Sequence, residues 1–272
     1  MRPTRIGAVG YLNARPLVEG LAEDPCGFDL RFDVPSVCAR LLHEGTVDIG
    51  LVPAIEYLRG DYIMAPGIGV AADGEVASVA LYTRRPIADV TSLALDTSSR
   101  TSAALTRVLC REYFRIEPVF VDHPPVLGDM LEACDAGLLI GDPALDADAA
   151  AFGAQKIDLG AAWKAHTGLP FVFAAWVGRA EYFTPAVVAA LEAAKVRGMA
   201  HLDRIADAAA GGDAARATKY RAYLRRNLQH DLGPRHTDAL RRFYQAAENV
   251  GVVDRAREPR FAARPGAAVP AI

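Results

Sequence analysis

Short apolar runs alternate with helical patterns along the first part of the chain. A short run of apolar residues predicts a buried strand, and apolar residues spaced three and four apart predict a helix. The strand-like runs occupy residues 5–9, 28–34 and 47–52, and the helical patterns that follow them occupy residues 16–22, 36–43 and 54–59. This alternation is typical of an α/β fold with a largely parallel sheet.

A middle block of the chain has an α/β alternation of its own. The apolar runs 78–82 and 171–177 bracket it. Within it lie strand-like runs at 93–95, 118–121 and 138–140 and helical patterns after residue 101 and around 129–134. A block inserted between two strands that leave and re-enter the first sheet predicts two lobes with a ligand cleft between them. We expect residues 1–82 and 175–272 to form the first lobe and residues 83–174 to form the second.

The remainder of the chain is predicted to be mostly helical. Thr184 and Pro185 offer an N-cap and a first-turn proline for a helix over 187–208, which a pair of glycines then ends. Two amphipathic helices are predicted over 214–230 and 237–250, with a glycine as the stop of the last one. From residue 255 onward the chain has no periodicity, which predicts an extended or disordered tail.

Composition indicates a globular protein and no charged surface for nucleic acid or lipid. Of 272 residues, 51% are apolar, which is enough for a substantial core. The net charge is −3, and no run of Lys or Arg indicates a nucleic-acid or lipid surface. No run approaches the roughly 20 apolar residues that span a bilayer. The N-terminal apolar run is broken by Asn13 and Arg15 before signal-peptide length, so we expect a cytoplasmic protein with no membrane partner.

The sequence carries no cofactor motif. Its four cysteines form no CxxC pair, and its six histidines form no HxH or HExxH set, so a metal site has no support. The first strand-like run is not followed by GxGxxG, and the chain has no P-loop, which argues against dinucleotides and nucleoside triphosphates. We therefore expect no cofactor, and the cleft predicted between the lobes leads us to expect a small-molecule substrate.

Five hydroxyl side chains and an arginine gather where the apolar run at 93–95 meets a helical pattern. They are Thr97, Ser98, Ser99, Arg100, Thr101 and Ser102. Unpaired backbone N–H groups and the positive end of the helix dipole lie at such a point, so the turn can hold a carboxylate or phosphate. The alternative is that one hydroxyl merely caps the helix, but five hydroxyls exceed what a cap requires.

Further candidates follow the other apolar runs, because ligands of open α/β sheets bind beyond the carboxyl ends of strands. Tyr11 and Asn13 follow the first run, and Asn13 can hydrogen-bond a ligand or cap the next helix. Tyr11 is either a ligand contact or a packed aromatic. Ser36 follows the second run, either as a plain cap or at a backbone anion site.

Ser78 and the pair Gly141 and Asp142 are the other candidates. Ser78 lies near the predicted hinge, and since no GxSxG elbow surrounds it, we do not expect a covalent nucleophile. Asp142 stands at a strand end before a proline, where it could position a hydroxyl, shuttle a proton or simply start a helix.

Five segments together resemble the chorismate dehydratases of the futalosine route to menaquinone. The matching stretches are residues 6–17, 45–53, 76–81, 95–102 and 139–145, which include the YLN and LDxSSRTS motifs. Pro53 and Ala54 depart from the pattern, because small hydroxyl residues are expected there. The resemblance implies a two-lobed periplasmic-binding-protein-like (type II) fold that holds no cofactor.

The resemblance also implies an activity and roles for the site residues. Chorismate would lose water from its ring to give 3-[(1-carboxyvinyl)oxy]benzoate, which makes the protein a hydro-lyase. Its two carboxylates suit an anion site of hydroxyls and helix N-termini. A substrate carboxylate would take the proton, while Asn13, Ser78 and the turn 97–102 orient the ring and the site excludes water.

Two alternatives stay open. A sister family of the same pathway forms 1,4-dihydroxy-6-naphthoate in a similar two-lobed fold, and the YLN start favours the dehydratase. A solute-binding protein could grip a small anion without changing it, but such proteins normally carry an export signal, which is not recognised here.

Overall fold

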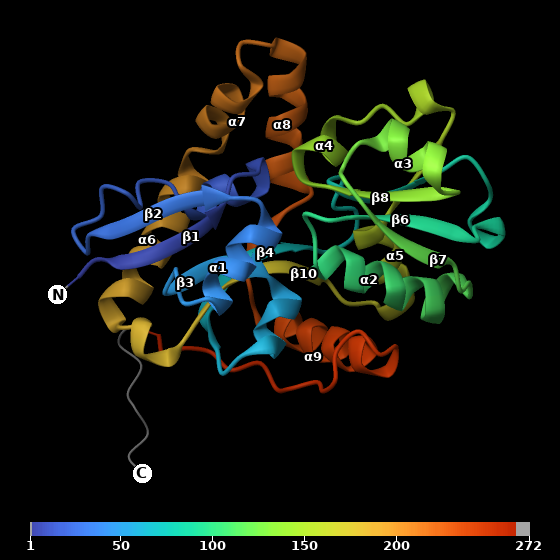
Figure 1. Cartoon of the computed structure of the whole chain (residues 1–272). Helices are drawn as coiled ribbons and strands as arrows, with labels where there is room; N and C mark the ends of the chain where they lie inside the picture. Colours follow the sequence, from blue (N-terminus) through green and yellow to red (C-terminus); the bar gives the residue numbers. More distant parts are fainter. Residues whose placement is uncertain (1, 265–272) are drawn as a thin grey trace.

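The computed structural model describes residues 2–264, which form two α/β lobes, each built on its own sheet (Figure 1). The first sheet has the order β11-β4-β10-β3-β1-β2 and the second the order β7-β6-β8-β5-β9. The strands of the first sheet are β1 (Thr4–Val9), β2 (Phe28–Asp33), β3 (Ile49–Pro53), β4 (Ile63–Ala72), β10 (Phe171–Gly178) and β11 (Gln229–Asp231). Those of the second are β5 (Val79–Thr83), β6 (Ser92–Asp96), β7 (Val119–His123), β8 (Ala136–Ile140) and β9 (Gln155–Asp158).

Both sheets are mixed. Strand β1 is parallel to β2 and β3, and β6 is parallel to β7 and β8. Strand β10 runs antiparallel between β3 and β4, and β5 runs antiparallel between β8 and β9. The ends of β1, β3 and β8 and the segments that follow β1, β6 and β8 all contribute residues to one cavity, so the two sheets direct their strand ends toward each other.

Helices cover the faces of the two sheets (Figure 1). The α-helices are α1 (Pro35–His43), α2 (Thr101–Leu109), α3 (Leu127–Ala133), α4 (Gly141–Asp146), α5 (Leu159–Thr167), α6 (Pro185–Ala200), α7 (Leu202–Ala210), α8 (Ala214–Arg226) and α9 (Pro234–Asn249). Short 3₁₀ segments are η1 (Leu12–Leu17), η2 (Ala54–Arg59), η3 (Ile87–Asp89), η5 (Ala150–Phe152) and η6 (Ala180–Tyr182), and η4 (Cys110–Phe114) is a π-helical turn. None of the helices in residues 2–264 combines the length and apolar character needed to cross a bilayer.

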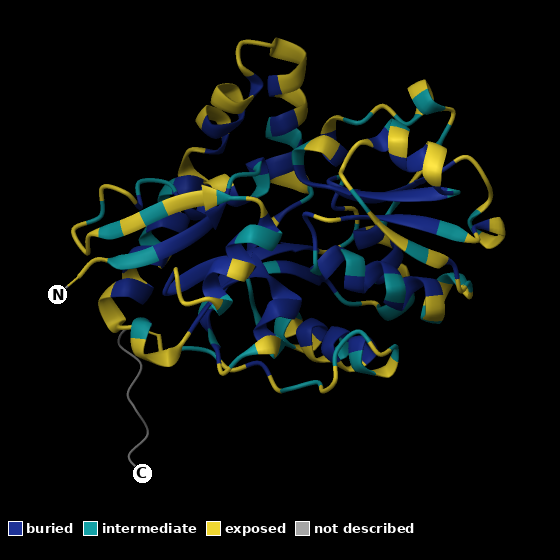
Figure 2. Ribbon diagram, in the orientation of Figure 1, coloured by how far each residue is buried: buried dark blue, intermediate teal, exposed yellow. Residues whose placement is uncertain are grey.

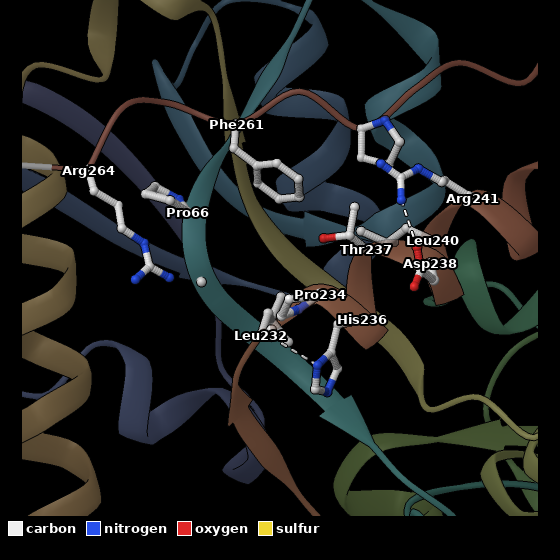
Figure 3. Close-up of a pocket in the computed structure, with 13 residues that line it drawn as sticks. Pro66, Leu232, Pro234, His236, Thr237, Asp238, Leu240, Arg241, Phe261 and Arg264 are labelled. Carbon is white, nitrogen blue, oxygen red and sulfur yellow. Dashed lines mark hydrogen bonds and ion pairs between the residues drawn. The ribbon is translucent and has the colours of Figure 1, made fainter. Parts of the chain in front are cut away.

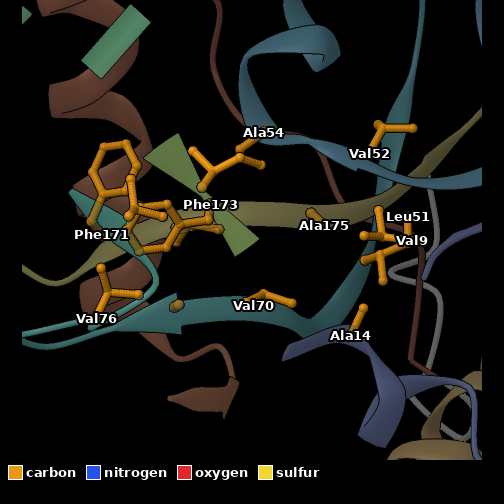
Figure 4. Packing of buried hydrophobic residues seen from close by; sticks show 14 of the residues in the cluster. Val9, Ala14, Leu51, Val52, Ala54, Val70, Val76, Phe171, Phe173 and Ala175 are labelled. Atoms are coloured by element: carbon orange, nitrogen blue, oxygen red, sulfur yellow. The ribbon is translucent and has the colours of Figure 1, made fainter. Parts of the chain in front are cut away.

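The buried core extends from one lobe into the other (Figure 2). Phe171 at the start of β10 packs edge to face on Trp163 of α5, with ring centroids 5.2 Å apart, and on Phe243 of α9 at 4.8 Å. Buried residues of β3, β4 and β10 continue this packing toward the lobe interface (Figure 4). An edge-to-face aromatic pair adds about 0.5–1.5 kcal/mol beyond the buried area. The aromatic cluster therefore fixes α5 and α9 against the strand that re-enters the first sheet.

The chain crosses between the sheets twice, at residues 73–78 and 168–170. In the first crossing, Asp158 accepts hydrogen bonds from the backbone N–H groups of Val76 (3.1 Å) and Ala77 (2.7 Å). Ala77 has φ +63°, and Ser78 N–H donates to the carbonyl of Val76 at 2.8 Å, which closes a tight γ-turn. The crossing is thus a sharply bent, well-anchored segment.

Most of the predicted strands are confirmed to within a few residues, but β4, β9 and β11 were not predicted. Strand β4 contains Pro66, Gly67 and Gly69, which are poor strand formers, and it is buried on both faces, so it shows no alternation. The run at 78–82 was predicted as the strand by which the chain leaves the first sheet, and that placement was wrong. The run is β5, which pairs in the second sheet with β8 and β9, and the strand before the crossing is β4. The lobe boundaries given above stay a prediction.

The predicted helices over 187–208 and 214–230 were too long. The first is two helices, α6 and α7, which meet at His201, where the backbone leaves helical geometry. The second ends at Arg226, and residues 229–231 form β11, because they pair with β4. The helix predicted over 16–22 is wrong, because the 3₁₀ segment η1 contains Pro16 and ends at Leu17, and residues 18–20 form a turn. The pattern at 54–59 is the 3₁₀ segment η2.

The tail from residue 255 is extended and lies against the first sheet. Met64 N–H donates to the Arg260 carbonyl at 2.9 Å, and Ala262 N–H donates to the Met64 carbonyl at 2.9 Å. The Tyr57 hydroxyl donates to the Glu258 carbonyl at 2.7 Å. The tail predicted as extended or disordered is thus extended and pinned by hydrogen bonds up to residue 264, and the rest of that prediction lies outside the described residues.

Candidate active site

A cavity of about 50 Å³ lies between the two lobes and brings together the strand ends named from the sequence. Its apolar wall comes mainly from the first sheet and its helical turns. Its polar residues are Tyr11, Asn13, Ser99, Thr101 and Ser102. The apolar residues around them are Val9, Ala14, Pro35, Leu51, Pro53, Val70, Val79, Ile140, Gly141, Phe173 and Ala174. A small polar patch within an apolar enclosure is the usual composition of a small-molecule site.

A larger cavity, of about 460 Å³, lies at the N-terminal end of α9 (Figure 3). It contains none of the residues singled out in the sequence. Arg241, one of its cationic side chains, is already paired with Asp238 at 2.7 Å and with Glu258 at 2.5 Å. The interlobe cavity, although smaller, is therefore the better candidate.

The turn before α2 presents hydroxyl groups to the interlobe cavity. The Ser99 hydroxyl oxygen accepts a hydrogen bond from Ser102 N–H at 3.2 Å, so Ser99 does cap the helix. The Thr101 hydroxyl oxygen accepts from Ile55 N–H, across the lobe interface, at 3.1 Å. Since both oxygens already accept a bond, their own protons are available to donate to a ligand. Capping and ligand binding are thus compatible in this turn.

Asp96, at the end of β6, holds the turn in place through hydrogen bonds. It was not singled out in the sequence. It accepts hydrogen bonds from the Ser98 hydroxyl at 2.6 Å and backbone N–H at 2.8 Å, and from Ile140 N–H at 3.2 Å. Burial raises the pKa of Asp96, and the hydrogen bonds from Ser98 and Ile140 oppose that rise. The predicted ligand residue Ser98 is thus turned toward Asp96, away from the cavity.

Tyr11 and Gly141 pack against each other on opposite sides of the lobe interface. Gly141 has φ +65°, and a Cβ at this position would lie 2.6 Å from Cδ2 of the Tyr11 ring. Only glycine fits both constraints. Burial is the main reason why the pKa of Tyr11 is raised, and its hydroxyl donates to Ser98 at 3.5 Å. The tyrosine is therefore a neutral, packed wall of the cavity.

Asp142 and Ser36 make contacts between the lobes and do not line the cavity. The Asp142 carboxylate accepts from Leu12 N–H at 2.9 Å, and burial raises its pKa despite that bond. The backbone N–H of Ser36 donates to the Ser98 carbonyl at 3.0 Å. Both residues hold the two lobes together beside the cavity.

Two members of the hydroxyl turn point elsewhere. Thr97 is exposed, and its N–H donates to the His123 carbonyl at 3.2 Å. Arg100 approaches Glu56 of η2, with Nη1 3.5 Å from Oε2, and so pairs with a fully buried carboxylate of the other lobe. Glu56 also contacts His43 Nε2 at 2.6 Å. Arg100 is thus engaged in an interlobe ion pair.

Asn13 lines the cavity, whereas Ser78 is fully buried and is not among the lining residues. The Ser78 hydroxyl accepts a hydrogen bond at 2.7 Å from Tyr223 of α8. The backbone carbonyl of Asn13 accepts from Nε2 of the buried His230 at 2.8 Å, and the imidazole is neutral because burial lowers its pKa. The sequence did not single out Tyr223 or His230. The apolar spacing of α8 was a signal for Tyr223, and His230 lies on β11, which was not predicted.

Among residues 2–264, no group of three His, Cys, Asp or Glu side chains is placed to hold a metal ion. The chemistry available at the cavity is therefore that of hydroxyls, an amide and backbone N–H groups. These groups can bind a carboxylate and orient a neutral ring.

Sequence comparison relates the chain to a biosynthetic family. The family described as menaquinone biosynthesis matches residues 4–249. A chorismate dehydratase of Thermus thermophilus is 35% identical over 228 residues, which is 77% of this chain and 83% of that protein. A chorismate dehydratase of Campylobacter jejuni is 30% identical over 174 residues, which is 62% of this chain and 64% of that protein.

Structural comparison confirms the fold class. A protein from Archaeoglobus fulgidus superimposes with a TM-score of 0.74 at 16% identity, covering 92% of this chain and 98% of that one. The periplasmic aliphatic sulphonate binding protein of Escherichia coli superimposes with a TM-score of 0.65 at 15% identity, covering 100% of this chain and 96% of that one. The two-lobed, periplasmic-binding-protein-like architecture predicted from the sequence is thus confirmed.

Proposed function

Because the chain belongs to the menaquinone biosynthesis family, and the curated relatives reported above are chorismate dehydratases, we propose that it removes water from chorismate to give 3-[(1-carboxyvinyl)oxy]benzoate. The observation that carries the proposal is the 35% identity over 228 residues with a chorismate dehydratase. The polar residues of the interlobe cavity are consistent with it, because they include four hydroxyl-bearing side chains and one amide.

The reaction is an elimination, which places the protein among the hydro-lyases. A ring carbon loses its hydroxyl, the adjacent carbon loses a proton, and the two leave as water while the ring becomes aromatic. Aromatisation supplies the driving force, so the protein has mainly to hold the ring in a reactive geometry and exclude water. No metal or nucleotide is needed for this step.

We assign the binding of a substrate carboxylate to the hydroxyl turn. Ser99 and Thr101 have hydroxyl protons free to donate, and Ser102 lines the same wall at the start of α2. A hydrogen bond to a charged group contributes about 1.5–3 kcal/mol. Ser98, Arg100 and Thr97 would support the turn without touching the substrate.

We assign the orientation of the ring to Asn13 and Ser78, and the proton to a substrate carboxylate. A neutral amide is far too weak a base to remove a carbon-bound proton. Tyr11 and Gly141 would form the wall against which the ring lies.

Substrate entry would require the two lobes to separate. Small-molecule sites usually measure about 300–1,000 Å³, whereas the interlobe cavity measures about 50 Å³. The two crossing segments at 73–78 and 168–170 are the natural hinges. Asp142 and Ser36, which bond across the interface, would then re-form their contacts around the bound substrate.

The test is to incubate the purified protein with chorismate and to follow the loss of one water by mass spectrometry. We expect conversion in the absence of added cofactor and in the presence of a chelator. Folded protein that leaves chorismate unchanged but consumes a futalosine-type substrate would place it in the sister family. Folded protein that binds chorismate and converts neither substrate would be a binding protein.

The role of Asn13 is tested in the same assay. Asn13→Ala leaves a polar substrate group unpaired and should slow single-turnover chemistry by about a hundredfold, since small misplacements have effects of that size. Asn13→Asp adds a negative charge beside a dianion and should weaken binding. A near-normal rate for Asn13→Ala would remove Asn13 from the site.

A further inference from the structure

Tyr223 reaches the proposed active site from a distant part of the chain. It lies on α8, the second helix of the α7–α8 hairpin, which stands beside the junction of the two lobes (Figure 1). Its hydroxyl donates to the Ser78 hydroxyl at 2.7 Å, and the two residues are 145 positions apart. The side chains of Tyr223 and Ser78 are almost completely buried, at 3% and 0% exposure.

The whole helix is anchored to the second lobe and to the first crossing segment. The Tyr220 hydroxyl, one turn before Tyr223, donates to Asp146 of α4 at 2.6 Å. Asn227, just beyond the end of α8, donates through its amide to the Glu75 carbonyl at 3.0 Å. The hydroxyl of Tyr223 is therefore held in a fixed position between these two anchors.

The direction of the hydrogen bond between Tyr223 and Ser78 determines where the Ser78 hydroxyl can direct its own proton. Burial raises the pKa of Tyr223, so the phenol is neutral and has one proton to give, which it gives to Ser78. A hydroxyl that accepts from Tyr223 must direct its own proton to a different acceptor. Ser78 is flanked by Val79 and bonded through its carbonyl to Gly141 N–H at 2.8 Å, and both neighbours line the interlobe cavity.

Asn13 is held by a different contact. Its backbone carbonyl accepts a hydrogen bond from Nε2 of the buried His230 at 2.8 Å, and the residue lines the interlobe cavity. The contact that Tyr223 makes in this region is therefore the one with Ser78.

We propose that Tyr223 is a positioning residue, which sets the orientation of the Ser78 hydroxyl for the proposed dehydration. This role rests on the proposed function. Tyr223 touches neither substrate nor reacting atoms, and a neutral phenol with a raised pKa is a poor base. Its contribution is therefore geometric. Through this hydrogen bond the α7–α8 hairpin positions Ser78, which lies in the first crossing segment.

The test compares two substitutions that each remove one buried tyrosine hydroxyl. Tyr223→Phe should lower kcat by about tenfold to a hundredfold with KM little changed, because misorientation acts on the chemical step. Tyr244→Phe is the matched control, since the Tyr244 hydroxyl is also fully buried and donates at 2.8 Å to the Ala54 carbonyl, outside the cavity lining. We expect the two variants to have similar melting temperatures and only Tyr223→Phe to lose kcat. Equal kcat values for the two variants would overturn the proposal.

A double-mutant cycle tests whether Tyr223 acts through Ser78. The double variant, with Ser78→Ala and Tyr223→Phe, should have nearly the same kcat as Ser78→Ala alone, because both changes remove the same hydrogen bond. Losses that multiply, or a Ser78→Ala variant with normal kcat, would contradict the proposal. Ser78→Ala also serves as the readout should Tyr223→Phe fail to fold.

Replacing Tyr223 with 3-fluorotyrosine keeps the hydrogen bond while making the phenol more acidic. A positioning residue then leaves the pH profile of kcat unchanged, whereas a shifted profile would show that the phenol itself exchanges a proton. Wild-type protein that does not convert chorismate would overturn the proposed function, and this role with it. An active wild type with an unaffected Tyr223→Phe would overturn the positioning role alone.

Discussion

Gly141→Ala tests how tightly the two lobes are packed at the proposed active site. A left-handed backbone costs an ordinary residue about 1–2 kcal/mol, and Gly141 has φ +65°. The added methyl would also lie 2.6 Å from the Tyr11 ring, too close to be accommodated without movement. Overpacking of this kind costs about 1–3 kcal/mol. The free energy of unfolding should therefore fall by about 2–5 kcal/mol.

Gly153→Ala separates the two effects. Gly153 has nearly the same backbone angle, φ +60°, but nothing lies within 4 Å of an added Cβ. Its cost should be that of the backbone alone, about 1–2 kcal/mol. The difference between the two variants then measures the clash with Tyr11.

Urea unfolding of both variants, together with chorismate turnover, provides the assay. We expect Gly141→Ala to be the less stable and to bind chorismate more weakly, because the displaced Tyr11 ring must move into a cavity of only about 50 Å³. Removing the ring with Tyr11→Ala should abolish the extra cost of Gly141→Ala. Equal destabilisation by Gly141→Ala and Gly153→Ala would refute the reasoning.

Two further predictions concern a buried carboxylate and the hydroxyl turn. Burial alone would raise the pKa of Asp48, but hydrogen bonds from Arg5 and Arg2 outweigh it and hold the pKa well below its usual range. The stabilisation is therefore present above the unfolded pKa of about 3.9 and is lost as the pH falls through the folded value. Asp48→Asn should lower the free energy of unfolding by about 2 kcal/mol at pH 7, and a gap that stays constant down to pH 3.5 in urea titrations would contradict this. Ser99→Ala combined with Thr101→Ala should weaken chorismate binding by about 3–6 kcal/mol in calorimetry, and wild-type affinity with a lowered melting temperature would show that the turn only caps α2.

The parts of the site that follow strand ends could be predicted from the sequence. Tyr11, Asn13, Ser99 and Thr101 were named because each comes just after an apolar run, and all four line the interlobe cavity. Position along the chain fixes which edge of a sheet a residue occupies, but not where its side chain points. Thr97, Ser98 and Arg100 belong to the same turn and point elsewhere for that reason.

The parts that were missed enter the site from far along the chain. Val70 lies on β4, which was not predicted because its glycines and proline are poor strand formers. Phe173 lies on β10, which was predicted as a strand, but its pairing with β4 was not. Tyr223 reads in the sequence as one apolar position of an amphipathic helix. Only the packing of α8 against the first crossing segment gives its hydroxyl a partner.

The order of strands in the first sheet has a consequence for synthesis on the ribosome. Strand β4 lies between β10 and β11, which follow it by about 100 and 160 residues. At about 5–20 residues per second, the apolar strand waits at least several seconds for its first neighbour. The second sheet, encoded entirely in that interval, can close first. The lobe that begins the chain is therefore finished last, and β4 is the segment most in need of protection by chaperones during translation.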